Sequence, residues 1–243
     1  MGDKIVAIHQ PNFLPWIGYF YKIVKSDIFV FLDSVQYTKN SFINRNKVKT
    51  SQGEMWLTVP VSFSFGQLIR EVRINNVVDW RKKHLKTLEI NYKKAKFFYE
   101  VFEIVEEVYY SEDWMNLSEF NICLIEKIMS YLGLSCSFVR SSSLGISGKG
   151  TELLVNIVKK VGGNVYLSGF GGAKYQEEKL FKNEGISLIY YDFTHPVYEQ
   201  LWGNFIPNLS IIDLLFNVGD GSASVIRNSG KVEGVLFSPF GKR

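Results

Sequence analysis

Short apolar runs alternate with longer segments of helical periodicity along most of the chain. The runs KIVAI and DIFVFLD enclose a helical pattern near residues 16–25. Farther along, NVYLSG and SLIYYDF enclose a second helical stretch. CSFVR is a further expected strand, and the helical pattern TELLVNIVKKV follows it after a loop-rich tract at 141–151. Strands that alternate with helices are typical of a mostly parallel sheet flanked by helices. The pattern therefore predicts an α/β protein with a Rossmann-like arrangement.

The region between these two units has other patterns. MWLTVPV (55–61) and LIREVRI (68–74) flank a Ser/Phe/Gly turn, which predicts a β-hairpin near 55–74. From 79 to 133 the apolar spacing changes to 3.6 residues, which indicates helices. We expect a single α/β domain over residues 1–243, with the hairpin and helical segment as a possible insertion at 55–133.

The composition limits the environment and the partners. The chain has 28 basic and 24 acidic residues, and a net charge of +4 is too small to indicate binding to a nucleic-acid backbone. Cys123 and Cys136 lack C-x-x-C and zinc-finger spacing, which favours a reducing compartment. We see no secretory leader and no apolar run near the roughly 20 residues that span a bilayer. We expect a cytoplasmic protein without stable membrane insertion, and its oligomeric state stays open.

Candidate site residues follow the predicted strands, because ligands of open α/β sheets bind beyond the strands' C-terminal ends. His9 and Gln10 follow the first strand, and Asp33 ends the second. Asn44 and Arg45 come next, and the donor fork of Arg45 suits an anionic substrate. A surface salt bridge is the alternative role of Arg45, and a capped strand end is that of His9.

The second α/β unit supplies further candidates. In LSGFGG (167–172) a strand runs into glycines and then a helix, a setting in which backbone amides approach a phosphate or a sugar. Ser168, Gly169 and Gly171 belong to this turn, which lacks G-x-G-x-x-G spacing. A plain turn is an equally good interpretation.

The chain has three histidines, His9, His84 and His195. A histidine with a pKa near 6.5 suits proton transfer at neutral pH. Their spacing matches no zinc signature, so we predict no metal site. His84 follows three basic residues on a predicted helix, and its role stays open between function and a solvated helix face.

Several blocks together resemble the WbqC-like family from residue 5 to about 219: IHQPNFLPWIGYFYKI, FVFLDSVQYTKNSFINRNKVK, WLTVPV, YLSGFGGAKY and FTHPVYEQLWGNFIPNLSIIDLLFNVG. The resemblance implies a bacterial protein connected with O-antigen or other surface-polysaccharide biosynthesis, and it implies no defined reaction. Carried over residue by residue, the blocks mark His9, Gln10, Asp33, Asn44, Arg45, Ser168, Gly169, Tyr175, His195, Tyr198, Gln200, Ser210 and Asp213. Ser34 stands where the family more often has a second acidic residue, which argues against a metal there.

These features favour a transferase that acts on an activated, nucleotide-linked sugar. Acyl or aminoacyl transfer to an amino sugar is the preferred reaction, with His9 as general base, Gln10 as oxyanion donor and His195 as a further catalytic candidate. We predict no cofactor, and glycosyl transfer would use the same phosphate-holding residues. The ligand is then a nucleotide-sugar or an activated acyl donor.

Two alternatives stay open. One is a non-catalytic sugar- or nucleotide-binding partner of the pathway's enzymes. The other rests on QPNFLPWIGYF, which resembles the Q-P-F-H-x-G-H turn of nucleotidyltransferases. Trp16 and Tyr19 occupy the positions of the two histidines that hold phosphate in that turn, so adenylyl transfer is in doubt.

Overall fold

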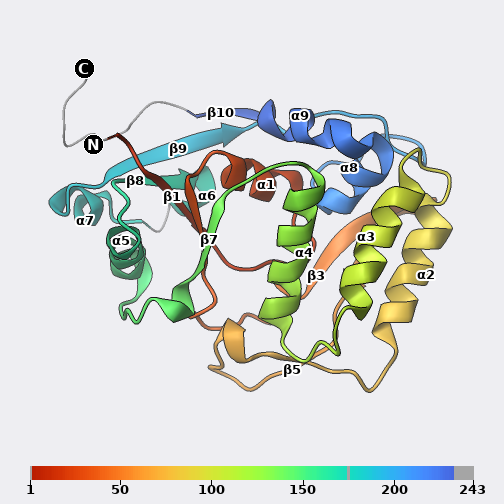
Figure 1. Cartoon of the computed structure of the whole chain (residues 1–243), viewed down its shortest axis with the longest axis horizontal. Coiled ribbons are helices and arrows are strands. Elements are labelled where there is room, and N and C mark those ends of the chain that lie inside the picture. Colours follow the sequence, from red (N-terminus) through yellow and green to blue (C-terminus); the bar gives the residue numbers. More distant parts are fainter. Residues whose placement is uncertain (1, 174–175, 233–243) are drawn as a thin grey trace.

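The structure is a computed structural model that describes residues 2–173 and 176–232. Its central sheet has the strand order β10-β9-β8-β1-β2-β7 (Figure 1). The strands are β1 (Ile5–His9), β2 (Ile28–Phe31), β7 (Ser137–Arg140), β8 (Val165–Gly169), β9 (Ser187–Phe193) and β10 (Gly230–Val232). Strands β9 to β7 pair in parallel, and β10 pairs antiparallel with β9. The predicted α/β fold with a mostly parallel sheet is confirmed.

Helices cover both faces of the sheet. Because successive side chains point to opposite faces, Ala7 and Phe29 pack in one core with helices α1 (Ile17–Val24), α4 (Leu117–Tyr131), α8 (Ile211–Val218) and α9 (Ser222–Arg227). Val6 and Val30 pack in another core with α5 (Gly150–Lys160) and α7 (Glu178–Asn183). Strands buried on both faces read as continuous apolar runs, which is why the sequence identified them.

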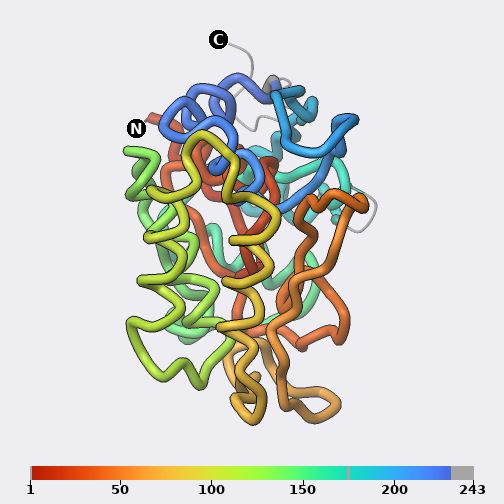
Figure 2. Tube along the Cα trace, turned by 90° about the vertical axis from the view of Figure 1, so that its right-hand side faces the viewer, coloured from red at the N-terminus to blue at the C-terminus, as the bar shows by residue number. Residues whose placement is uncertain are grey.

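The predicted helical segment forms a layer of three helices. Helix α2 (Trp80–Tyr92) begins at Asp79, whose side chain accepts a hydrogen bond from the Lys82 amide at 3.1 Å. Helix α3 (Phe98–Tyr110) packs against both α2 and α4. Figure 2 views the molecule from the side on which these helices stand together.

Two small antiparallel pairs lie outside the central sheet. Strand β3 (Arg45–Thr50) pairs with β4 (Gly53–Thr58), and β5 (Val61–Ser62) pairs with β6 (Arg73–Ile74). The hairpin expected near 55–74 is therefore present as the β5–β6 pair, whereas residues 55–58 pair with β3 instead. The sequence RNKVKT of β3 has no apolar alternation, because Asn46 and Lys49 are buried in polar contacts.

The strand order contains one change of direction. From β1 the chain crosses through α1 to β2 on one side, and from β8 it crosses through α7 to β9 on the other. Strands β1 and β8 are neighbours, so their C-terminal ends flank a topological switch point. Ligands of open α/β sheets bind in the crevice at such a point.

Candidate functional site

Strands β1 and β8 part at the switch point. Their pairing ends at Ala7 and Leu167, whereas β1 stays paired with β2 as far as His9. The His9 carbonyl accepts from the Leu32 amide at 2.8 Å, so the preceding carbonyl, that of Ile8, points to the β8 side. It accepts a hydrogen bond from Lys22 Nζ at 2.7 Å. The side chain of Lys22 therefore reaches from α1 to the opening between the two strands.

Lys22 is a buried cation without an acidic partner. It is 5% exposed, and no ion pair of the described residues includes it. Burial lowers the pKa of its amine from 10.5 to about 7, because the ammonium loses hydration and no carboxylate compensates. One of its three protons is used by the Ile8 carbonyl, so the group keeps donors for a ligand.

His9 is half-buried beside this lysine. Its Nδ1 lies 3.1 Å from the Gln10 carbonyl oxygen and is the donor, and the Tyr19 hydroxyl donates to the same oxygen at 3.0 Å. The His9 and Tyr19 rings meet edge to face, with centroids 4.8 Å apart. No described residue bonds to His9 Nε2. Burial, with the Lys22 charge second, lowers the pKa of His9 to about 4. At pH 7 the imidazole is therefore neutral, and Nε2 is a free proton acceptor.

The turn after β1 is fastened from three distant segments. Asn121 Nδ2 donates to the Pro11 carbonyl at 2.9 Å, and Asn46 Nδ2 donates to the Leu14 carbonyl at 2.7 Å. Ser210 Oγ donates to the same Leu14 oxygen at 2.8 Å. The segment around Ser210 also forms a bridge with Trp16 and so lies across the start of α1. The turn is therefore a rigid support for His9.

The other predicted residues near His9 differ in how many hydrogen bonds they make and in how much space surrounds them. The Gln10 side chain is half-buried and has no hydrogen bond to a described residue. Ser168 Oγ accepts from Gln176 Nε2 at 2.9 Å and donates to the Gly169 carbonyl at 3.2 Å. A Cβ on Gly169 would lie 3.1 Å from the Tyr191 hydroxyl, whereas one on Gly171 would meet open space.

The glycine-rich turn expected after β8 is instead a four-residue helix, α6 (Phe170–Ala173). Its start continues directly from the end of β8, so LSGFGG does lie at the same sheet edge as His9. Tyr175, which the family resemblance marks as a candidate site residue, lies outside the described residues.

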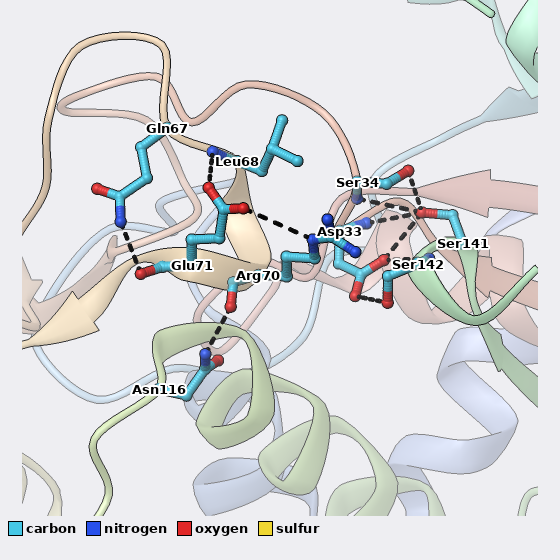
Figure 3. Close-up of polar contacts among 9 residues, drawn as sticks. All are labelled: Asp33, Ser34, Gln67, Leu68, Arg70, Glu71, Asn116, Ser141 and Ser142. Atoms are coloured by element: carbon cyan, nitrogen blue, oxygen red, sulfur yellow. Dashed lines mark hydrogen bonds and ion pairs between the residues drawn. The ribbon is translucent and has the colours of Figure 1, made fainter. Parts of the chain in front are cut away.

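Asp33 lies at the next strand end, and its bonding capacity is used within the protein (Figure 3). Oδ1 accepts from Ser141 Oγ and from the Ser142 amide, both at 2.9 Å, and Oδ2 accepts from Ser142 Oγ at 2.6 Å. The carboxylate is 1% exposed. It joins the ends of β2 and β7.

Asn44 immediately precedes β3, and Arg45 is the first residue of that strand. Asn44 is buried, and its Nδ2 donates to the Val59 carbonyl at 3.1 Å. Arg45 donates to the Asn40 carbonyl at 2.7 Å, and its guanidinium lies 4.3 Å from the centre of the Trp56 ring. None of the contacts of Arg45 with described residues reaches His9 or Lys22, so the structure does not bring Arg45 together with the crevice residues.

The late candidates fasten the segment 194–210. His195 donates from Nδ1 to the Pro196 carbonyl at 2.9 Å, and its Nε2 accepts from the Asn208 amide at 2.9 Å. Burial lowers the pKa of His195. The Tyr198 hydroxyl donates to Asp213 at 2.9 Å, and Gln200 Oε1 accepts from Lys49 Nζ at 3.0 Å.

Asp213 is the centre of this second polar network. It is fully buried and also accepts from the Tyr92 hydroxyl at 2.7 Å, and burial raises the pKa of its carboxyl group. The network connects α2, α8 and β3 through Tyr92, Asp213 and Lys49. Its side chains satisfy one another, which is the pattern of a structural anchor.

Both ring nitrogens of His84 have partners within the protein, which indicates a structural role. Its Nε2 lies 3.0 Å from the Thr58 carbonyl oxygen, and its Nδ1 lies 3.2 Å from the Tyr109 hydroxyl. It is buried, which lowers its pKa to about 4. Within the described part of the chain, His9 is thus the one histidine with a ring nitrogen that has no partner.

Lys22 and Tyr19 are candidate site residues that the sequence interpretation missed. A signal was present, because Lys22 is the one charged residue of the apolar helix IGYFYKIV and lies three residues after Tyr19, on the same face. Trp16, by contrast, packs against Phe193 with ring centroids 4.8 Å apart. Its indole lies over Gly18, where an added Cβ would come within 2.4 Å of the ring.

Residues 2–173 and 176–232 contain no group of three or more His, Cys, Asp or Glu side chains placed to hold a metal ion. Within the same residues, none of the helices combines the length and the apolar character needed to cross a membrane.

Comparison with known proteins gives one family and one close relative. The model of the WbqC-like protein family matches residues 10–225 of the chain. A protein of Mycobacterium tuberculosis named "Uncharacterized protein Rv1507c" is 40% identical over 227 residues, which are 92% of this chain and 98% of that protein. No solved structure matches the chain.

Proposed function

The chain belongs to the WbqC-like protein family, and we propose that it is a transferase of bacterial surface-polysaccharide (O-antigen) biosynthesis that acts on an activated, nucleotide-linked sugar. Its site is the crevice between the ends of β1 and β8. The observation that carries the proposal is a neutral histidine, His9, with a free Nε2 beside Lys22, a buried ammonium without an acidic partner. A proton acceptor and an anion-binding group are thus neighbours at the switch point.

The two groups have complementary roles. Lys22 would hold a phosphate or carboxylate oxygen of the donor, because an acidic ligand would offset the cost of its burial. His9 would take the proton, since Nδ1 is committed to the Gln10 carbonyl and Nε2 is available. The side chain of Gln10, which has no described partner, could donate to the oxygen that becomes negative.

Acyl or aminoacyl transfer to an amino sugar uses these groups without further reactants. The amine nitrogen forms a bond to the acyl carbon, and its proton goes to His9 Nε2. The bond between the acyl carbon and the leaving group then breaks, and His9 returns the proton to that group. Atoms and charges balance, and the products are an amide and the protonated leaving group.

The test is ligand-induced thermal stabilisation. The ligand panel contains nucleotide-sugars, acyl-CoA thioesters and nucleoside triphosphates, with wild type, Lys22→Met and Arg45→Ala side by side. We expect one ligand class to stabilise wild type and Arg45→Ala but not Lys22→Met. Lys25→Met is the matched control, because Lys25 caps the same helix and its Nζ lies over the Tyr21 ring.

A turnover assay with the stabilising donor and an amino-sugar acceptor follows, with amide product detected by mass. Product from wild type supports the transferase. Donor binding without product, unchanged in His9→Ala, would replace it with a non-catalytic binding partner of the pathway's enzymes. Stabilisation that depends on Arg45 and not on Lys22 would move the donor site to the hairpin.

A further inference from the structure

A second group of cations surrounds a hollow far along the chain from the crevice residues. The hollow has a volume of about 260 Å³ and lies between the C-terminal half of α2 and the turn at Trp202. Its lining is Lys86, Glu89, Ile90, Lys93, Lys94 and Trp202. None of these residues belongs to the groups proposed for catalysis.

Trp202 has an unusual backbone conformation. Its φ angle is +64°, in the left-handed region that bulky residues rarely adopt, and Gly203 follows at +65°. The indole nitrogen donates to the Asn91 carbonyl at 2.7 Å, which ties the turn to α2. The side chain nevertheless stays 36% exposed. Strained backbone of this kind clusters at active sites, ligand clamps and switch regions, so the turn at Trp202 is a candidate for ligand binding.

The charges around the hollow are unbalanced. Glu89 is shared by Lys86 at 3.5 Å and Lys93 at 3.2 Å, whereas Lys94 has no partner among the described residues. Three lysines and one glutamate leave two positive charges in excess. The C-terminal end of a helix attracts cations, which accounts for Lys93 and Lys94 but not for the aromatic ring or the hollow. Ile90, which is 64% exposed, adds an apolar wall.

We propose that this hollow binds an anionic sugar, with the sugar ring against Trp202 and Ile90 and its phosphate or carboxylate on Lys94 and Lys86. Apolar faces of sugars pack on aromatic rings, and exposed ammonium groups bind acidic oxygens as point charges. The volume is just below the usual range of ligand pockets, which begins near 300 Å³, so it suits a monosaccharide phosphate better than a whole nucleotide-sugar. The site is independent of the proposed transferase activity.

Binding of glucose 1-phosphate, followed by saturation-transfer NMR and calorimetry at low salt, tests the proposal. Wild type should bind it more tightly than glucose or inorganic phosphate. Lys94→Gln should weaken binding roughly fivefold, and Lys86→Gln with Lys94→Gln should weaken it further. Lys83→Gln is the control, since Lys83 is exposed on the same helix but does not line the hollow. Both lysines are exposed, so these variants should fold normally.

Three results would overturn the proposal. The first is an affinity for inorganic phosphate equal to that for glucose 1-phosphate, which would show that the sugar ring contributes nothing to binding. The second is unchanged affinity in the double lysine variant. The third is binding to phosphatidylglycerol vesicles but not to glucose 1-phosphate, which would identify a lipid surface instead. The double lysine variant should keep the donor-induced stabilisation that depends on Lys22, because Lys86 and Lys94 line only the hollow, so failure here is distinguishable from failure of the transferase proposal.

Discussion

Two strand ends at the same edge of the sheet carry polar side chains, and they differ in how much bonding capacity is left. At the end of β2 the Asp33 carboxylate receives three hydrogen bonds from Ser141 and Ser142. At the end of β1 His9 Nε2 has no described partner, and Lys22 contacts a single backbone carbonyl. The first end uses its bonding capacity within the protein, whereas the second leaves part of it unused.

The difference between the two strand ends shows that unused hydrogen-bonding capacity, and not position at the sheet edge, distinguishes a candidate site. Both ends lie where ligands of α/β sheets bind, and the sequence marks both equally. Buried polar groups are normally satisfied within the protein, because an unpaired one costs free energy. The unused donors of Lys22 and the unpartnered Nε2 of His9 therefore make the end of β1 the stronger candidate for ligand binding, whereas the bonded carboxylate of Asp33 is accounted for by structure.

The largest expected effect is on turnover by His9. His9→Ala should lower kcat by roughly a hundredfold or more if His9 takes the proton, with little change in thermal stability. His195→Ala is the contrast, because both ring nitrogens of His195 are bonded within the protein; it should lose stability and keep most turnover. Equal losses of turnover in the two variants would contradict the distinction.

The pH dependence of activity tests whether His9 and Lys22 act at the end of β1 as proposed. His9 must be unprotonated, so activity should persist until the pH falls toward about 4, well below an ordinary histidine limit near 6.5. Lys22 must be protonated to hold the donor, so KM should rise as the pH increases through about 7. An acid limb near 6.5 in kcat/KM would show that His9 is not the base.

Lys22 also makes stability depend on pH. Its pKa is lower in the folded chain, about 7, than the ordinary 10.5, so the unfolded chain binds more protons between these values. The free energy of unfolding should therefore rise with pH across this window, by roughly 3 kcal/mol. Urea unfolding at pH 7 and at pH 10 measures this, and Lys22→Met should remove most of the rise.

Asp33→Ala should show the cost of breaking the complete strand end. It leaves two serine hydroxyls and one backbone amide without their acceptor, so we expect a loss of about 2 kcal/mol in unfolding free energy. Turnover per folded molecule should stay close to wild type. A variant of normal stability with no activity would place Asp33 in the site after all.

Arg45→Ala should have the smallest effect. It removes a cation that lies over Trp56 and one hydrogen bond to the Asn40 carbonyl, for a loss of about 1 kcal/mol or less. Denaturant unfolding and donor affinity would both be measured. A tenfold loss of affinity would restore Arg45 as the anion-binding residue that the sequence favoured.

Four strands of the central sheet can be predicted from the sequence because their residues are buried on both faces of the sheet. KIVAI, DIFVFLD, NVYLSG and SLIYYDF all correspond to strands of the central sheet. Strand β3 could not be predicted from the sequence. Its buried Asn46 and Lys49 make hydrogen bonds to residues that only the folded chain brings near.

The sequence predicts which strand ends meet at the candidate site, but not which side chains there are left without a partner. Parallel topology places His9 and LSGFGG at one edge, and the sequence order of strands and helices is enough to predict that. The partners that saturate Asp33 and His195 come from 108 and 13 residues away, so their capacity could not be judged from sequence. Lys22 was overlooked because a lysine on a helix is usually taken to be solvated.

The fastening of the turn at Pro11 to Pro15 has a consequence for how the chain folds. Its hydrogen bonds to Asn46, Asn121 and Ser210 close sequence separations of 32, 110 and 196 residues. Contacts of long range form late, because the entropy of closing the loop must be lost before they can form. During synthesis Ser210 leaves the ribosome after most of the chain, so we expect the support of His9 to be completed last. A nascent chain that stops short of Ser210 would carry β1 and α1 without a finished crevice.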